Sequence, residues 1–151
     1  MFRKTTTLIV FILLFIANYA NADGVVFEKR QLQIVNSEGK KYNFTVEIAD
    51  TVEKQQQGLM FRKKIADNSG MLFLFDKERM VSMWMKDTYI PLDVVFIKAN
   101  GTISNIVERT VPLSKESIFS EEEVNAVLEL KAGTCAKLNI KKNDRVSLKT
   151  N

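Results

Sequence analysis

The 151-residue sequence contains no histidine, only two prolines and a single cysteine, Cys135. The lack of histidine excludes Ser–His and Cys–His nucleophilic mechanisms and every His-ligated metal site. One cysteine cannot form an internal disulfide, and we expect Cys135 to be a buried, unreactive, small apolar side chain. Any chemistry must therefore use carboxylates, Lys, Tyr or backbone groups.

The sequence also lacks a strong excess of charge. It has 22 basic and 18 acidic residues, a net charge of +4, and these residues are interspersed. Lys63-Lys64 and Lys141-Lys142 are only pairs, whereas a nucleic-acid-binding surface needs a dense basic stripe. We therefore expect no nucleic-acid partner.

The first 22 residues resemble a secretory signal peptide. Arg3 and Lys4 precede the apolar run 8–17, and Ala20-Asn21-Ala22 has the small-x-small pattern of a cleavage site. An uncleaved anchor is the alternative, but the run is short for a span of about 20 residues. We expect cleavage after Ala22, one domain over 23–151, membrane contact only during export, and a periplasmic or secreted protein.

The remaining chain has the pattern of a mostly β protein. Apolar residues alternate with polar ones over 31–34 and 41–48, and the turn residues 36–39 between them predict a hairpin. The run Met71–Phe75 has no alternation, which indicates a strand buried on both faces or a short core helix. Turn signals at Gly70 and over 76–78 favour the strand. Further strands are expected over 81–85, 93–98, 103–107, 125–130 and 145–148.

Short helices and tight turns complete the predicted fold. Asp50 and Glu53 fit a capping box for a short helix that Gly58 ends. Asn100-Gly101 predicts a second hairpin, a helical turn is expected over 135–138, and Asn139 and Asn143 suit left-handed backbone. We predict a β-rich α+β fold, either a compact antiparallel sandwich or a partly closed barrel, with one or two short helices.

Several segments occur in an order and spacing that resemble one known family. They are Gly58-Leu59-Met60-Phe61-Arg62, Gly70-Met71-Leu72-Phe73, Trp84-Met85-Lys86-Asp87-Thr88, Pro91-Leu92-Asp93, Val127-Leu128-Glu129-Leu130 with Gly133, and Asp144-Arg145-Val146. The chain is similar to the domain of unknown function 192 family, which implies a single β-rich domain, often exported, without an established activity. The family pattern usually has Asn at Asp87, and Gly at Asn139 and Asn143.

The stretch 83–93 holds the only Trp and a polar group of residues between apolar flanks. Trp84 offers a flat platform for a sugar or a planar ligand, and Lys86 and Arg62 would hold an anionic group. The alternative is structural, with Trp84 in the core and Asp93 pairing with Lys86 or capping backbone amides. The candidate ligand-binding residues are Arg62, Trp84, Lys86, Asp87, Thr88 and Asp93.

Two other functions remain open at this point. Asp87 and Asp93 could serve a carboxylate-dependent hydrolase, and the thioethers of Met83 and Met85 could bind Cu(I). We expect neither a cofactor nor a resident metal. The favoured function is a non-catalytic binding domain for a small polar ligand or a cell-envelope partner.

Overall fold

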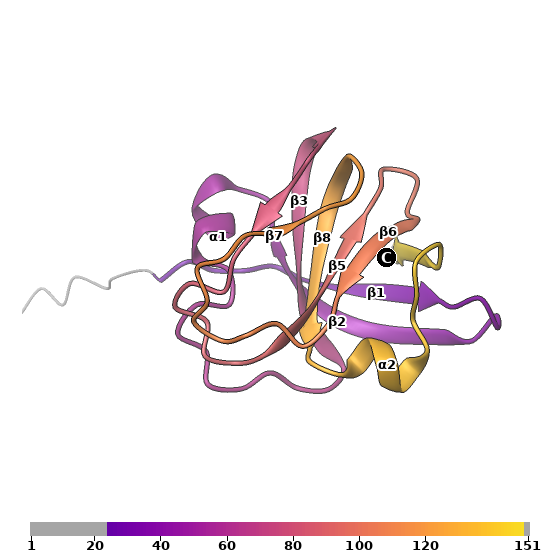
Figure 1. Ribbon diagram of the computed structural model, residues 1–151, viewed down its shortest axis with the longest axis horizontal. Coiled ribbons are helices and arrows are strands. Elements are labelled where there is room, and N and C mark those ends of the chain that lie inside the picture. Colours follow the sequence, from indigo (N-terminus) through magenta and orange to yellow (C-terminus); the bar gives the residue numbers. More distant parts are fainter. Residues whose placement is uncertain (1–23, 150–151) are drawn as a thin grey trace, which may run out of the picture.

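The computed structural model describes residues 24–149, which form two β-sheets and two short helices. The signal peptide predicted over residues 1–22 lies outside this range. A seven-stranded sheet has the order β6-β5-β8-β3-β2-β1-β9, and β4 pairs with β7 in a small second sheet (Figure 1). The elements are β1 (Lys29–Val35), β2 (Lys41–Ala49), α1 (Val52–Gln57), β3 (Ser69–Arg79), β4 (Ser82–Met83), β5 (Leu92–Ile97), β6 (Ile103–Val107), β7 (Ile118–Phe119), β8 (Val124–Lys131), α2 (Thr134–Leu138) and β9 (Arg145–Leu148).

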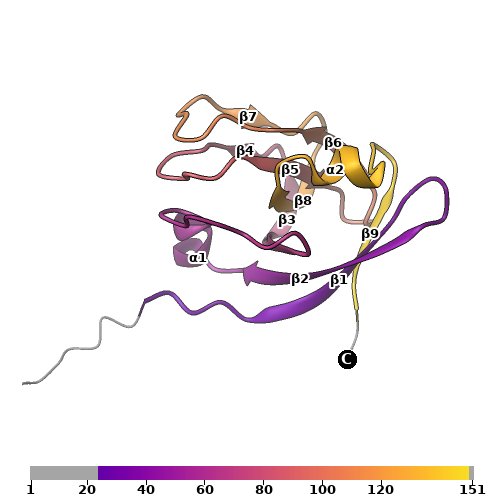
Figure 2. The ribbon, with the colours of Figure 1, turned by 90° about the horizontal axis from the view of Figure 1, so that it is seen from below.

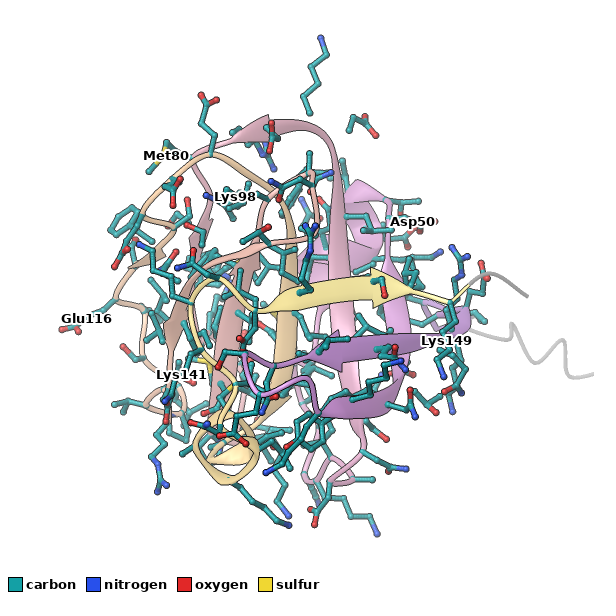
Figure 3. All side chains as sticks on the ribbon, turned by 90° about the vertical axis from the view of Figure 1, so that its right-hand side faces the viewer. Asp50, Met80, Lys98, Glu116, Lys141 and Lys149 are labelled. Carbon is teal, nitrogen blue, oxygen red and sulfur yellow. The ribbon has the colours of Figure 1, made fainter. Side chains whose placement is uncertain are left out.

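The large sheet curls until its two edges meet. The Val146 N–H donates to the Gly101 carbonyl at 2.8 Å, and the Ile103 N–H donates to the Asp144 carbonyl at 2.9 Å. These bonds join the start of β9 to the β5–β6 turn, and Figure 3 shows β9 (yellow) running beside β1. The mostly β class and the partly closed barrel are therefore confirmed. The pairing is antiparallel except between β2 and β3, which are parallel.

Turn chemistry determines both predicted hairpins. The Asn36 side chain accepts hydrogen bonds from the Glu38 and Lys40 N–H groups, which holds the β1–β2 turn. Gly101 has a φ of +81° and its N–H donates to the Lys98 carbonyl, as a tight turn between β5 and β6 requires. Asn139 and Asn143 have φ angles of +53° and +75°, so the left-handed backbone expected there is present.

The hydrophobic core has two parts, one on each face of the large sheet. The first collects side chains from all seven strands and fills the inside of the curl. The second lies on the outer face, beneath the β4–β7 ribbon and the loops that flank it (Figure 2). Along β3, Leu72 faces the first part while Met71 and Phe73 face the second. This division explains why the run has no polar alternation.

Three local predictions are wrong. Residues 76–78 were expected to form a turn but belong to β3, which continues to Arg79 after its register with β8 shifts. The N-cap of α1 is Thr51, whose side chain accepts from the Lys54 N–H, rather than Asp50. The strand expected over 81–85 has only two paired residues, Ser82 and Met83, because its single partner β7 is equally short.

Candidate ligand-binding site

The central loop of the site, 84–91, is held between two other loops by backbone hydrogen bonds. The Phe61 N–H donates to the Asp87 carbonyl at 2.8 Å, and the Leu113 N–H donates to the Thr88 carbonyl at 3.0 Å. On its other side the Met85 N–H donates to the Ser114 carbonyl at 3.0 Å. These contacts fix the loop that carries most of the predicted site residues.

Asp93, at the start of β5, has a structural role. Its fully buried carboxylate accepts hydrogen bonds from the N–H groups of Arg109, Gly133 and Cys135, at 2.9, 3.0 and 2.9 Å. The side chain thus ties β5 to the loop after β6 and to the start of α2. Of the two structural alternatives for Asp93, the capping of backbone amides is the one present.

Arg62 and Asp87 do not line the principal cavity of the domain. The Arg62 guanidinium pairs with the Glu47 carboxylate at 2.8 Å and lies 6.0 Å from the centre of the Phe27 ring. Asp87 has a φ of +53°. Asn and Asp both adopt this left-handed conformation more readily than other side chains. Asp87, like the Asn that the family resemblance implies at this position, therefore suits the local backbone geometry.

Trp84, Lys86 and Thr88 come together on that cavity, which has a volume of about 710 Å³. Residues of α1 line the cavity, and Figure 1 shows α1 at one side of the molecule. Its walls come from α1 and the residues that follow it, from the second half of β3, and from β4. The apolar part of the lining includes Leu59, Met60, Phe73, Phe75, Val81 and Met83.

Glu129 is the ionisable group at the buried end of this cavity. It lies on β8 between Met71 of β3 and Val94 of β5, and only 4% of its surface is exposed. Within the described residues no side-chain hydrogen bond or salt bridge to its carboxyl group is present, and burial is the sole cause of its pKa shift. Its oxygens are not among the fully enclosed unpartnered atoms, which fits a group that faces a cavity. Burial without a compensating charge raises the pKa of Glu129 to about 8, so the group is mostly protonated at pH 7.

The mouth of the cavity carries the opposite charge. The Lys86 ammonium lies 5.4 Å from the centre of the Trp84 ring, and the Arg79 guanidinium lies 4.6 Å from the centre of the Phe75 ring. Trp84 is 51% exposed, so it borders the opening and does not fill the core. Cations held over aromatic faces are oriented without being neutralised.

The methionines predicted for copper have different environments. Met85 is buried in the second core, and its sulfur accepts a hydrogen bond from the Thr110 hydroxyl at 3.1 Å. Met83 lines the cavity together with Met60 and Met80. In the part of the chain that the structure describes, no group of three His, Cys, Asp or Glu side chains is placed to hold a metal ion.

Sequence reasoning missed Glu129 as a site residue. One signal was available, because β8 is buried along almost its whole length and Glu129 is the only charged side chain inside that buried run. A carboxyl there must either be paired or face a cavity. The sequence alone does not give the face of the strand on which such a cavity lies.

A family model described as DUF192, an uncharacterized ACR, matches residues 33–148. The chain belongs to the domain of unknown function 192 family. The match spans the whole cavity and most of the sheet. A search of curated proteins finds no match to this DUF192 chain.

Two solved structures resemble this DUF192 domain closely. A protein from Sinorhizobium meliloti 1021, described as a "putative transcription regulator", is 42% identical with a TM-score of 0.81, over 83% of this chain and 97% of that one. A protein of unknown function from Novosphingobium aromaticivorans DSM 12444 is 33% identical with a TM-score of 0.77, over 80% of this chain and 86% of that one.

Proposed function

We propose that this DUF192 domain binds a small polar ligand in the cavity, with Glu129 as the buried anchor. The observation that carries the proposal is a carboxyl group that is 4% exposed, has no partner among residues 24–149, and lines a cavity of about 710 Å³. A buried polar group without a partner destabilises a fold, whereas a ligand that supplies the partner offsets that loss. Pockets for small ligands commonly have volumes of roughly 300–1,000 Å³.

The surroundings of Glu129 support binding more than they support a carboxylate-dependent hydrolase. Asp93 already accepts three backbone hydrogen bonds, and Asp87 does not line the cavity. Two-carboxylate chemistry needs a second acid near the first. Among the described residues that line this cavity, Glu129 is the only acid.

The remaining alternative partners are a cell-envelope protein and nucleic acid. Seven lysine and arginine side chains of the described residues pair with carboxylates, so these surface charges occur as pairs of opposite sign. Mixed charge favours neither partner, whereas the cavity concentrates polar and aromatic groups at one place. The regulatory description of the Sinorhizobium meliloti protein therefore does not alter our proposal.

A ligand screen on purified protein tests this function. We would follow thermal unfolding with a library of envelope sugars, amino acids, amines and small acids, and then measure hits by calorimetry. We expect at least one hit whose dissociation constant rises tenfold or more in Glu129→Gln. Glu123→Gln, which changes an exposed acid one residue before β8, is the matched control and should leave affinity unchanged. An absence of hits, or hits that bind Glu129→Gln equally well, contradicts the proposal.

Cu(I) is a second candidate because Met60, Met80 and Met83 line the same cavity beside Trp84. Thioethers are soft ligands that select Cu(I). Anaerobic titration against a Cu(I) chelator should show one bound ion that Met83→Leu releases, while the core variant Met85→Leu retains it. Equal Cu(I) affinity in the wild type and Met83→Leu excludes these thioethers as the site.

A further inference from the structure

The cavity lining combines a buried acid, Glu129, with two more exposed cations, Lys86 and Arg79, and this difference in depth restricts the ligand. We infer, on the basis of the proposed function, that the ligand is zwitterionic, with a protonated amine against Glu129, an apolar spacer, and an acidic group at Lys86 and Arg79. The inference adds a chemical class and an orientation to the proposed site.

The buried end of the cavity lacks a positive charge. The residues opposite Glu129 on the flanking strands are Met71 and Val94, both apolar and fully buried. The neighbouring walls include Leu59 and Phe73, which are also buried. A carboxylate in such surroundings needs a ligand that brings both positive charge and hydrogen-bond donors. An ammonium group supplies both.

The outer end offers two cations. Lys86 and Arg79 line the cavity, and neither forms a salt bridge within the described residues. Each lies over an aromatic ring, which keeps the cation at the mouth. An acidic ligand group there gains charge-assisted hydrogen bonds in a partly desolvated place. The apolar residues of the same lining, which include Leu59, Phe73 and Val81, suit an alkyl spacer.

Binding of an ammonium group must change the protonation of Glu129. Below pH 8 the carboxyl group holds a proton, which it releases to solvent when it pairs with the ammonium as a carboxylate. The other charged groups that line the cavity are Lys86 and Arg79, which stay cationic, and α1 contributes uncharged glutamines. Affinity should therefore rise about tenfold per pH unit up to pH 8 and then level off.

Calorimetry with a matched series of small molecules tests the inference. The probes are linear ω-amino acids of four to eight carbons, alkylamines without the acid, and alkanoates without the amine. We expect the best ω-amino acid to bind at least tenfold more tightly than its matched amine and acid. At pH 7, titration in buffers of different ionisation enthalpy should show release of about one proton per ligand.

Variants test the contacts with the amine and with the acid of the ligand separately. Glu129→Gln should abolish proton release and the preference for an amine. Lys86→Gln should reduce ω-amino acid affinity toward that of the matched amine, whereas Lys115→Gln, an exposed lysine outside the cavity, should change nothing.

The outcomes distinguish this inference from the proposed function. The inference that the ligand is zwitterionic is overturned if alkanoates bind tightly without proton release. It is also overturned if Lys86→Gln leaves the affinity for the ω-amino acids unchanged. If none of the series binds but a library compound binds through Glu129, the inference fails while the proposed function stands. If neither the series nor the library binds, both fail.

Discussion

At the scale of one residue, Glu129 shows a conflict between stability and the proposed function. In the unfolded chain a glutamate has its ordinary pKa of 4.5, while in the fold burial raises the pKa of Glu129 to about 8. Between these values the unfolded state loses a proton that the folded state keeps, so the free energy of unfolding falls as pH rises. The loss begins above pH 4.5 and is complete above pH 8.

We predict that Glu129→Gln stabilises the ligand-free protein at neutral pH. The neutral amide has a similar shape and does not ionise in the unfolded chain, so the gain at pH 7 should be about 3 kcal/mol. Denaturant unfolding at pH 4 and pH 7 checks this difference, which should nearly vanish at pH 4 because Glu129 is then protonated in both states. The control Glu123→Gln should leave the pH dependence unchanged. A variant less stable than the wild type at pH 7 would show that the carboxyl has a partner in the fold.

Some roles of individual residues could be predicted from the sequence, and others could not. The capping of backbone amides by Asp93 was one of two structural alternatives, because a carboxyl beside loops rich in N–H groups commonly caps them. The grouping of Trp84, Lys86 and Thr88 followed from their nearness in sequence. The position of Glu129 beside them depends on the pairing of β3 with β8, which connects residues far apart in the chain.

At the scale of elements, closure of the barrel depends on Gly101. A Cβ at this position would lie 2.6 Å from the Val146 carbonyl oxygen of β9, and the φ of +81° disfavours any side chain. Gly39 has a similar φ of +75°, but a Cβ there would meet nothing within 4 Å. The two glycines therefore share the backbone strain and differ in the contact with β9.

Comparing the stability losses of Gly101→Ala and Gly39→Ala measures the effect of the contact between residue 101 and β9. Gly39→Ala should lose about 1–2 kcal/mol through left-handed strain alone. Gly101→Ala should lose about 1–3 kcal/mol more, because the clash displaces β9 from the turn. Denaturant unfolding measures the loss of stability in each variant. Hydrogen exchange at the Val146 amide should become faster only in Gly101→Ala. Equal losses would mean that the edge contact contributes nothing to stability.

Turns were predictable at this scale because their chemistry is local. Asn36, Gly101 and Asn139 each adopt the conformation that their residue type favours. The extension of β3 through residues 76–78 was not predictable from local pattern. Its three charged side chains are exposed beyond the point where β3 leaves its regular register with β8, and such residues suit a turn as well as a strand. The parallel β2–β3 pair, with α1 between its strands, likewise depends on non-local pairing.

At the scale of the whole molecule, the environment of the single cysteine bears on the proposed export. Cys135 is fully buried, and burial together with the nearby Asp93 carboxylate raises the pKa of its thiol well above the ordinary range. A thiol that stays protonated and inaccessible resists oxidation. Between residues 24 and 149 no helix has the length and apolar character needed to cross a membrane. The buried thiol is compatible with the periplasmic or secreted location that we propose.

Export with cleavage after Ala22 remains a prediction from the leader sequence. In a bacterial expression host, the intact mass of protein from the envelope fraction should correspond to a chain that begins at Asp23. Ala22→Arg should block cleavage, because the site requires a small residue immediately before the cut, and the uncleaved chain should stay membrane-associated. Ala17→Ser, farther from the cut, is the control and should be processed normally. Recovery of a chain beginning at Met1 from the envelope would refute cleavage, and recovery from the cytoplasm would refute export itself.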